Sequence, residues 1–335
     1  MKKSFIIWIC LFAALLPFNG QAQSQVGTTA SAFLEIPAGA RSIGMGESHV
    51  SVADDIMSIY WNPAGITSIE GNEATFQNTE WFVDTKLYYA AAAFQFDNKV
   101  IGGFVYMFDG GNMDVRTVTF PEGTGESFSV YDISLGLTYA QRLTQSLSVG
   151  GNLKYVQNRI WRMSAGTVAM DLGFHYKMPV EGLKLGFSIS NFGGEMKMEG
   201  DNSYVPVDLD PQTSGNNDGI PANLRMSSWD LPLIFRIGTN YRLFQSIDHS
   251  LVISADAIYP NNNDPHINAG AEYGFKDLFF LRGGYSHLFV TQNYAQGNLR
   301  FGGGVAVADR IGVDYAYSDR GELGSIHSIG VVLKF

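Results

Sequence analysis

The sequence predicts an all-β membrane protein, an antiparallel outer-membrane β-barrel of about 14 strands with a short N-terminal helical plug. Three observations support this fold class. Apolar and polar residues alternate with a period of two over many segments, the connections between these segments are alternately short and long, and the pattern of an export signal comes first. The composition agrees, because 38 Gly, 23 Phe and 16 Tyr accompany only 16% charged residues.

The first 22 residues have the pattern of a signal peptide. A basic start precedes an apolar run from Phe5 to Leu16, and Gly20-Gln21-Ala22 supplies the small residues that a signal peptidase reads. The apolar run is shorter than the roughly 20 residues that a transmembrane helix needs. We therefore expect an exported chain that loses residues 1–22. Cys10 would leave with this peptide, and the mature chain would then have no thiol chemistry.

Residues 23–71 lack the two-residue period and predict a compact helical plug or hatch in front of a barrel at 72–335. Asp54 and Asp55 would lie in the first turn of a short helix, where the helix dipole favours carboxylates. The apolar positions of this helix fall on one face at spacings i, i+4, i+7 and i+8: Val52, Ile56, Ile59 and Tyr60.

The motif Trp61-Asn62-Pro63-Ala64-Gly65 would end this helix abruptly. Proline disfavours a helical backbone at the residue that precedes it, so the helix should stop at Asn62. Gly65 would then allow the chain to turn. The segment would thereby stay separate from the first strand of the barrel.

The barrel segments place alternate side chains on opposite faces. In YDISLGLTYA at 131–140, Tyr, Ile and Leu share one face, while Asp, Ser, Gly and Thr share the other. A lipid-facing band outside and a polar lumen inside explain this pattern. The predicted strands are 72–80, 86–96, 99–109, 127–142, 146–160, 165–177, 183–193, 229–243, 249–259, 265–275, 278–288, 298–308, 310–319 and 325–335.

The connections test the barrel independently, because such barrels alternate short periplasmic turns with longer external loops. The predicted periplasmic turns are short: Asp97-Asn98, Leu143–Gln145, Met178–Gly182, Phe244–Asp248, Lys276-Asp277 and Asp309. The long external loops are Gly110–Glu126, Gly194–Ser228 and Phe289–Gly297. A secreted soluble β-sandwich is the alternative fold, since its strands also alternate. The short-long rhythm disfavours it.

The last predicted strand ends in Phe335. A terminal aromatic residue on an alternating strand resembles the insertion signal read by the outer-membrane assembly machinery. We expect that machinery and outer-membrane lipid as partners, and the bacterial outer membrane as the location. Trp81, Phe82 and Trp229 lie near predicted strand ends, where an aromatic girdle is typical.

Charge and residue spacing disfavour other functions. The net charge of −10 argues against nucleic acid, which binds clustered Lys and Arg. The six histidines are scattered without metal-ligand spacing, and nothing beside Ser286-His287 completes a catalytic triad. We predict no enzyme, no cofactor and no metal site.

The predicted loop 194–228 is acidic, with carboxylates among Asn, Gly and Pro. Carboxylates suit Ca²⁺, but the spacing of an EF-hand is absent, and a solvated loop is the simpler interpretation. If the loop binds a protein partner, its apolar anchors would be Tyr204, Leu224, Met226 and Trp229.

The stretch AGARSIGMGESHVSVADDIMSIYWNPAGI at 38–66 resembles the N-terminal signature of the PorV/PorQ-like proteins of the Bacteroidota. These belong to the wider FadL-type superfamily of outer-membrane barrels. The matching elements are Ala40-Arg41, Gly44-Met45-Gly46, Ala53-Asp54-Asp55 and Trp61-Asn62-Pro63-Ala64-Gly65. The barrel portion matches by length and strand count.

This resemblance implies two possible functions. PorV/PorQ-like proteins are associated with type IX secretion, where they handle or anchor cargo without enzymatic turnover. FadL-type channels admit hydrophobic small molecules through an N-terminal hatch with an Asn-Pro-Ala motif, here Asn62-Pro63-Ala64, and a kinked wall strand. Gly102-Gly103 is a candidate for the kink, because paired glycines weaken a strand ladder. Glycine pairs also occur at Gly150-Gly151, Gly283-Gly284 and Gly302–Gly304.

We interpret the chain as a non-enzymatic accessory to type IX secretion or surface attachment that acts through protein contacts, with secretion components or cargo as partners. The alternative is a passive channel for the uptake of hydrophobic compounds. A channel needs an apolar pocket and a route through the hatch or wall, whereas a partner-binding barrel places apolar groups on exposed loops.

Overall fold

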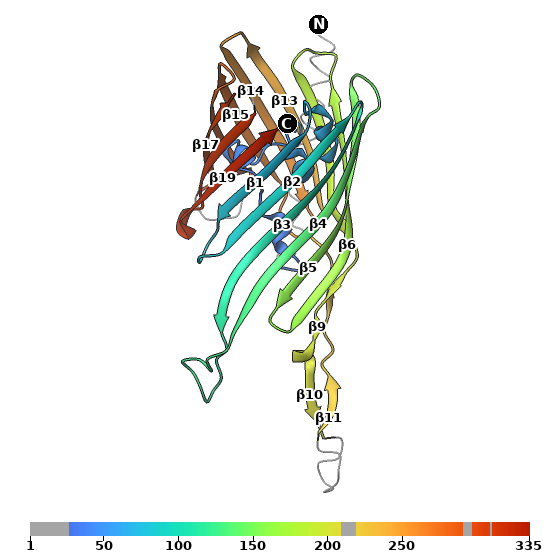
Figure 1. Cartoon of the computed structure of the whole chain (residues 1–335), viewed down its shortest axis with the longest axis vertical. Coiled ribbons are helices and arrows are strands. Elements are labelled where there is room, and N and C mark those ends of the chain that lie inside the picture. The colour runs from blue at the N-terminus through green and yellow to red at the C-terminus, as the bar shows by residue number, and fades with distance from the viewer. Residues whose placement is uncertain (1–26, 209–218, 291–296, 309) are drawn as a thin grey trace.

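The computed structural model describes residues 27–208, 219–290, 297–308 and 310–335, so the predicted signal peptide lies outside the described residues. Fifteen strands form one antiparallel sheet. Pairing of the first strand with the last, for example Phe76 with Val331, closes the sheet into a barrel (Figure 1). The remaining strand, β9 (Glu199–Gly200), pairs only at the external end of β6, so the barrel wall has the predicted 14 strands (15 − 1).

The predicted strands are confirmed as the strands of this wall. The wall consists of β1 (Glu73–Glu80), β2 (Lys86–Phe96), β3 (Lys99–Asp114), β4 (Ser127–Arg142), β5 (Leu147–Ile160), β6 (Met163–Lys177), β7 (Leu183–Gly193), β13 (Ile234–Gln245), β14 (His249–Pro260), β15 (His266–Phe275), β16 (Phe279–Leu288), β17 (Leu299–Val307), β18 (Ile311–Asp319) and β19 (Ser325–Lys334). Each strand pairs with its neighbours in sequence, apart from the closing pair.

The predicted strand 229–243 differs at its start, because β13 begins only at Ile234. Pro232 lacks the N–H that a ladder needs and explains the delay. The predicted loop 194–228 is also more ordered than expected, and its described part adds short elements: β8 (Met196–Lys197), β9, η3 (Asp201–Ser203), β10 (Tyr204–Val207), β11 (Ile220–Asn223) and β12 (Ser228–Trp229). The β10–β11 hairpin projects beyond the barrel (Figure 1).

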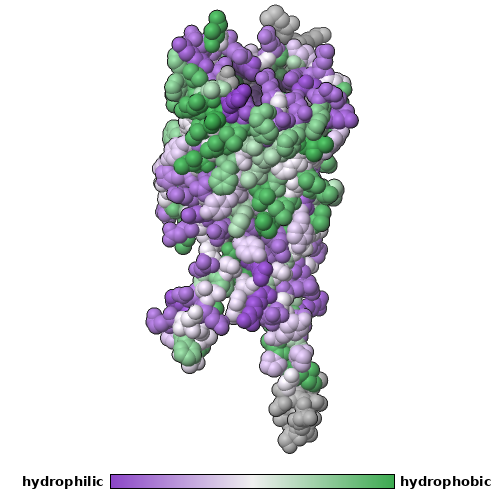
Figure 2. Space-filling view, viewed as in Figure 1, coloured by the Kyte–Doolittle hydropathy of each residue, from purple (hydrophilic) through white to green (hydrophobic). Residues whose placement is uncertain are grey.

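The wall has an apolar outer face, as the alternation predicts. On β6 the outward side chains at Val168, Met170, Leu172 and Phe174 are exposed, and those between them face the lumen. Figure 2 shows hydrophobic side chains in a band across the visible wall, with hydrophilic side chains at both ends. No helix within the described ranges is long and apolar enough to cross a bilayer.

Residues 31–69, which we call the plug, lie inside the barrel. Their short helices are η1 (Ala32–Glu35), α2 (Ala40–Gly44), α3 (Ser58–Trp61) and η2 (Pro63–Ser68). Most of their side chains are buried, and they contact strands on several sides of the lumen. A molecule that crosses the lumen from one end of the barrel to the other must therefore pass this segment.

The predicted plug helix is shorter than expected. Asp54 and Asp55 precede α3 rather than lying in its first turn, because Arg41 binds both carboxylates and Asp55 also accepts the N–H of Met57. The helix does end before Pro63, with Asn62 extended at φ −159°.

Gly65 serves close packing and not the predicted turn. It lies within η2, and a Cβ atom at this position would overlap Ala53. The sharp change of direction is made by Asn62 and Pro63 instead, since the proline starts a new 3₁₀ helix.

Lumen-facing glycines of the wall make room for the plug backbone. A Cβ atom at any of them would collide with plug atoms: Gly150, Gly173, Gly186, Gly270, Gly284 and Gly302. Gly102-Gly103, the candidate kink, keeps its register with both β2 and β4. The register of β3 shifts instead between Asp109 and Asn112, nearer its external end.

Gly283 and Gly284 provide a matched test of this packing. We expect Gly284→Val to lower the free energy of unfolding by about 1–3 kcal/mol, because its side chain would collide with Met45 and Gly46. Gly283→Val should be nearly neutral, since a Cβ there meets nothing within 4 Å. Urea titration and limited proteolysis of the plug would measure both. Equal effects of the two substitutions would contradict the packing role.

Candidate functional site

The Asn62-Pro63-Ala64 motif fixes the plug to one side of the wall. Asn62 is fully buried, and its side-chain amide donates to the carbonyl oxygens of Val50 at 2.9 Å and Phe174 at 3.0 Å. Gly150 and Gly173 of β5 and β6 leave the space in which the motif packs. The motif therefore joins two plug segments to the wall through one amide.

A charged cluster fixes the opposite side of the plug. Arg41 of α2 donates to Asp54 and Asp55 at 2.8 Å each within the plug, and to both oxygens of Glu272 on β15 at 2.7 and 2.8 Å. Glu272 also pairs with Arg282 of β16 at 2.6 Å. We call this group the Arg41 clamp. Arg41 thus pairs with Asp54 and Asp55, the two carboxylates that we predicted to interact with a helix dipole.

The charge of Arg41 keeps both plug carboxylates ionised. Burial alone would raise the pKa of Asp55, but the adjacent Arg41 guanidinium and His49 hold it well below its usual range. The pKa of Asp54 is lowered in the same way, with burial opposed by Arg41 and Lys184. The two acids thus anchor the plug as anions.

A second clamp lies toward the external end. Glu47 accepts hydrogen bonds from Arg300 at 3.2 Å and Arg320 at 3.0 Å. Burial opposes ionisation of Glu47, yet the charges of the two arginines lower its pKa to about 2. The plug is therefore held by ion pairs to Glu272 of β15, to Arg300 of β17 and to Arg320, which follows β18.

The plug contacts β2 and β3 through aromatic rings. Tyr60 packs edge-on against Tyr89 and Tyr106, and Tyr89 stacks on Phe104. The hydroxyl groups of Tyr60 and Tyr106 donate to the carbonyl oxygen of Ile36 at 2.7 and 2.8 Å. This side of the plug is apolar except for these phenol groups.

An apolar cavity of about 330 Å³ opens near the external end of β4–β6. Met196, Met198, Met226 and Trp229 line it together with Ile160 and Ala165. Thioether side chains adapt to irregular apolar ligands. Trp229, expected in a girdle, thus lies against this cavity.

The four predicted partner anchors separate in the structure. Met226 and Trp229 line the external cavity, whereas Tyr204 and Leu224 lie at the β10–β11 hairpin, 57% and 50% exposed. Phe335 pairs its backbone with Asn72 beside the barrel closure. Its role in insertion stays a prediction.

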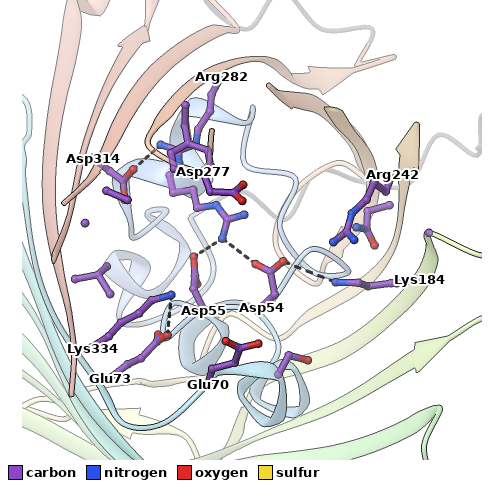
Figure 3. A pocket seen from close by; sticks show the side chains of 18 of the residues that line it. Asp54, Asp55, Glu70, Glu73, Lys184, Arg242, Asp277, Arg282, Asp314 and Lys334 are labelled. Carbon is purple, nitrogen blue, oxygen red and sulfur yellow. Dashed lines mark hydrogen bonds and ion pairs between the residues drawn. The ribbon is translucent and has the colours of Figure 1, made fainter. Parts of the chain in front are cut away.

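A larger cavity of about 920 Å³, which we call the vestibule, opens at the end of the barrel that bears the short turns. Residues of three such turns line it, among them Met178, Asp277 and Arg310. Figure 3 shows the carboxylates of Asp54 and Asp55 within it. Its lining combines acidic and basic side chains with apolar ones such as Val305 and Val332, and the many charged groups favour water over an apolar ligand.

Sequence reasoning missed the residues that hold the plug from the wall. Glu272, Arg282 and Arg300 occupy lumen-facing positions in strands, where their charges indicated only a wet interior. A charged residue followed by glycines, as at Arg282-Gly283-Gly284, is the feature of the sequence that could have indicated these contacts with the plug. Over the parts of the chain that are described, no group of three or more His, Cys, Asp or Glu side chains is placed to hold a metal.

Neither a protein-family model nor a curated protein matches the chain. Solved structures do match. The CymD monoaromatic hydrocarbon channel aligns with TM-score 0.57 at 14% identity, over 89% of this chain and 97% of that chain. The Ralstonia pickettii toluene transporter TbuX gives 0.55 at 13%, over 88% and 97%. A Pseudomonas aeruginosa FadL homologue gives 0.57 at 12%, over 90% and 99%.

At these identities the likeness shows the fold. The chain shares the barrel architecture of these three proteins, and its closed sheet with an apolar outer face supports the expected location in the bacterial outer membrane. The three structures are described as a channel, a transporter and a FadL homologue. The PorV/PorQ assignment stays a prediction, and the comparisons fit the channel interpretation better.

The second clamp predicts a pH dependence. Because folding lowers the pKa of Glu47 from 4.5 to about 2, its contribution is complete above about pH 4.5 and is lost as the pH falls toward 2. The shift corresponds to about 3 kcal/mol. Glu47→Gln should remove this dependence and lower stability at neutral pH by a similar amount, measured by urea titration at several pH values.

Glu199→Gln is the matched control, because Glu199 forms an exposed pair with Lys197 at 3.1 Å. Such pairs contribute less than about 1 kcal/mol. The same pH profile for wild type and Glu47→Gln would refute the clamp.

Proposed function

We propose that this chain is a passive channel for small hydrophobic compounds, closed in this structure by the plug. The supporting observation is one continuous cluster of buried apolar side chains. It begins at Met196 and Ala165, which line the external cavity, and reaches Phe104 of the wall and Ile59 and Ile66 of the plug. An apolar compound bound in the external cavity would contact apolar side chains along the whole of this cluster.

The asymmetric attachment of the plug suggests which contact opens. Displacing the ion pairs of the Arg41 clamp would leave buried charges unpaired, at a cost of roughly 3–5 kcal/mol. Apolar ligand surface can replace apolar plug surface at much smaller cost, because both exclude water. The compound would therefore pass between the plug and the aromatic side chains of β2 and β3, away from the Asn62 amide that joins the plug to β6. The descriptions of CymD and TbuX as channel and transporter for aromatic hydrocarbons agree with such a ligand.

A disulfide lock tests this function. Thr67 of η2 and Ser148 of β5 have hydroxyl oxygens 2.8 Å apart, so cysteines at both positions can form a bridge between plug and wall. We expect intact cells that produce the chain to take up radiolabelled toluene faster than cells without it. Oxidation of Thr67→Cys/Ser148→Cys should abolish the difference, and reduction should restore it.

Each single cysteine variant is the control, because neither can be locked. Uptake equal to that of cells without the chain would overturn the channel. Uptake that persists through the oxidised lock would overturn movement of the plug.

The secretion accessory role is the second candidate, and the exposed hairpin favours it. Tyr204 and Leu224 leave apolar surface outside the barrel, where a protein partner could bind. We expect Tyr204→Ser/Leu224→Ser to reduce co-purification of type IX components or cargo from native cells at least about threefold if this role is correct, while Met226→Ser leaves it unchanged. Mass spectrometry of mild-detergent extracts measures this. If no type IX components or cargo co-purify with the wild-type chain, the role is refuted.

A further inference from the structure

Two exposed arginines lie where the β5–β6 hairpin ends, on the external side of the wall (Figure 1). Arg159 is the last residue but one of β5, and Arg162 lies in the connection to β6. Neither guanidinium forms an ion pair within 4 Å with a carboxylate of the described ranges. The exposed cation Lys197 on the adjacent β8, in contrast, pairs with Glu199 at 3.1 Å. The two arginine charges are therefore available to an anion outside the chain.

Aromatic rings support both guanidinium groups. That of Arg159 lies 5.9 Å from the ring centre of Tyr131 on β4, and that of Arg162 lies 5.2 Å from the ring centre of Trp161. Arg159 also donates to the Tyr131 hydroxyl at 3.3 Å and to the Trp161 carbonyl oxygen at 3.4 Å. Contact with a ring face leaves the N–H groups at the edge of a guanidinium free to bind a ligand. The rings thus orient the two charges without neutralising them.

Trp161 occupies a position where turn stability alone would favour a different residue. Ile160 pairs with Met163, so Trp161 and Arg162 form a two-residue hairpin connection. Such connections favour Asn and Gly, because they require positive φ angles. Trp161 has a φ of 53°, which bulky side chains rarely adopt, and its ring packs against Phe128 at 5.7 Å. The hairpin tip therefore presents a ring and a charge at a cost in local stability.

The arginines border the lipid-facing band of the wall. Arg159 is paired in register with Tyr131, and four residues further along the same outward face of β4 is Leu135, which is 44% exposed. On β5, the outward side chains of Leu153 and Tyr155 precede Arg159 on the same face and are exposed as well. The apolar band thus ends next to the two guanidinium groups. In an outer-membrane barrel this is the level of the lipid headgroups in the outer leaflet.

We propose that Arg159 and Arg162 bind a phosphate group on the headgroup of an outer-leaflet lipid. Guanidinium groups match phosphate in both charge and hydrogen-bond geometry. The acyl chains of the same lipid would cover Leu135 and Tyr155, which a free anion would leave exposed. The net charge of the chain is −10, so attraction for an anion comes from this local pair and not from the whole molecule. The site goes beyond the channel function and does not depend on it.

Native mass spectrometry of the full chain in an uncharged detergent tests the site. The probes are lipid A with its phosphate groups and the same lipid after enzymatic removal of the phosphates. We expect wild type to bind the phosphorylated form about tenfold or more tightly than the dephosphorylated form, because hydrogen bonds to charged groups are strong. Arg159→Gln/Arg162→Gln should bring the two affinities within about twofold of each other.

Lys99→Gln/Lys177→Gln is the matched control, because these two exposed lysines lie at the end of the barrel that bears the short turns. It removes the same charge and should keep the wild-type preference. Equal affinities of wild type for the two lipids, or a preference that survives Arg159→Gln/Arg162→Gln, would overturn the site. The comparison of the two lipids needs only wild type and decides the matter even if a variant fails to fold. Displacement of the lipid by inorganic phosphate at equal concentration would overturn a lipid as the occupant.

Discussion

The closed hydrogen-bond ladder is the constraint on which the rest of the structure depends. A bilayer offers no partner to backbone N–H and C=O groups, so the sheet must close, and pairing of β1 with β19 achieves this. Closure around 14 strands creates a lumen too wide for wall side chains alone to fill. The plug fills it, and glycines such as Gly173 and Gly284 let its backbone approach the wall.

The plug is attached differently on its two sides, and under the proposed channel function this difference determines which side opens. On β15–β18, the carboxylates and guanidinium groups around Arg41 and Glu47 neutralise one another in a buried setting. On β2 and β3, rings such as Tyr89 and Phe104 meet the plug without ion pairs. Buried ion pairs are costly to break singly, whereas apolar contacts can be exchanged for others.

Much of the wall was predictable because its signals are local. Period-two alternation and turn length depend only on neighbouring residues, so the strands followed from sequence with shifts such as that at Pro232. The interior of the plug was less predictable. Asp54 and Asp55 looked like helix-start acids, yet their partner Arg41 is 13 and 14 residues away and Glu272 is 231 residues from Arg41. Contacts across such distances leave no periodic trace.

The same limit explains why the sequence could not choose between secretion and transport. The lumen-facing positions of the wall are rich in Gly, Ser, Asp and Thr. The wall alone therefore gives no indication of an apolar pocket. Folding supplies the missing apolar surface from the plug, through Ile59 and Tyr60, and from the loop, through Met196 and Met226. Because the plug and the loop are far apart in the sequence, these apolar surfaces come together only once the chain is folded. Under the proposed channel function, transport would therefore depend on the plug-wall interface, which no single segment encodes.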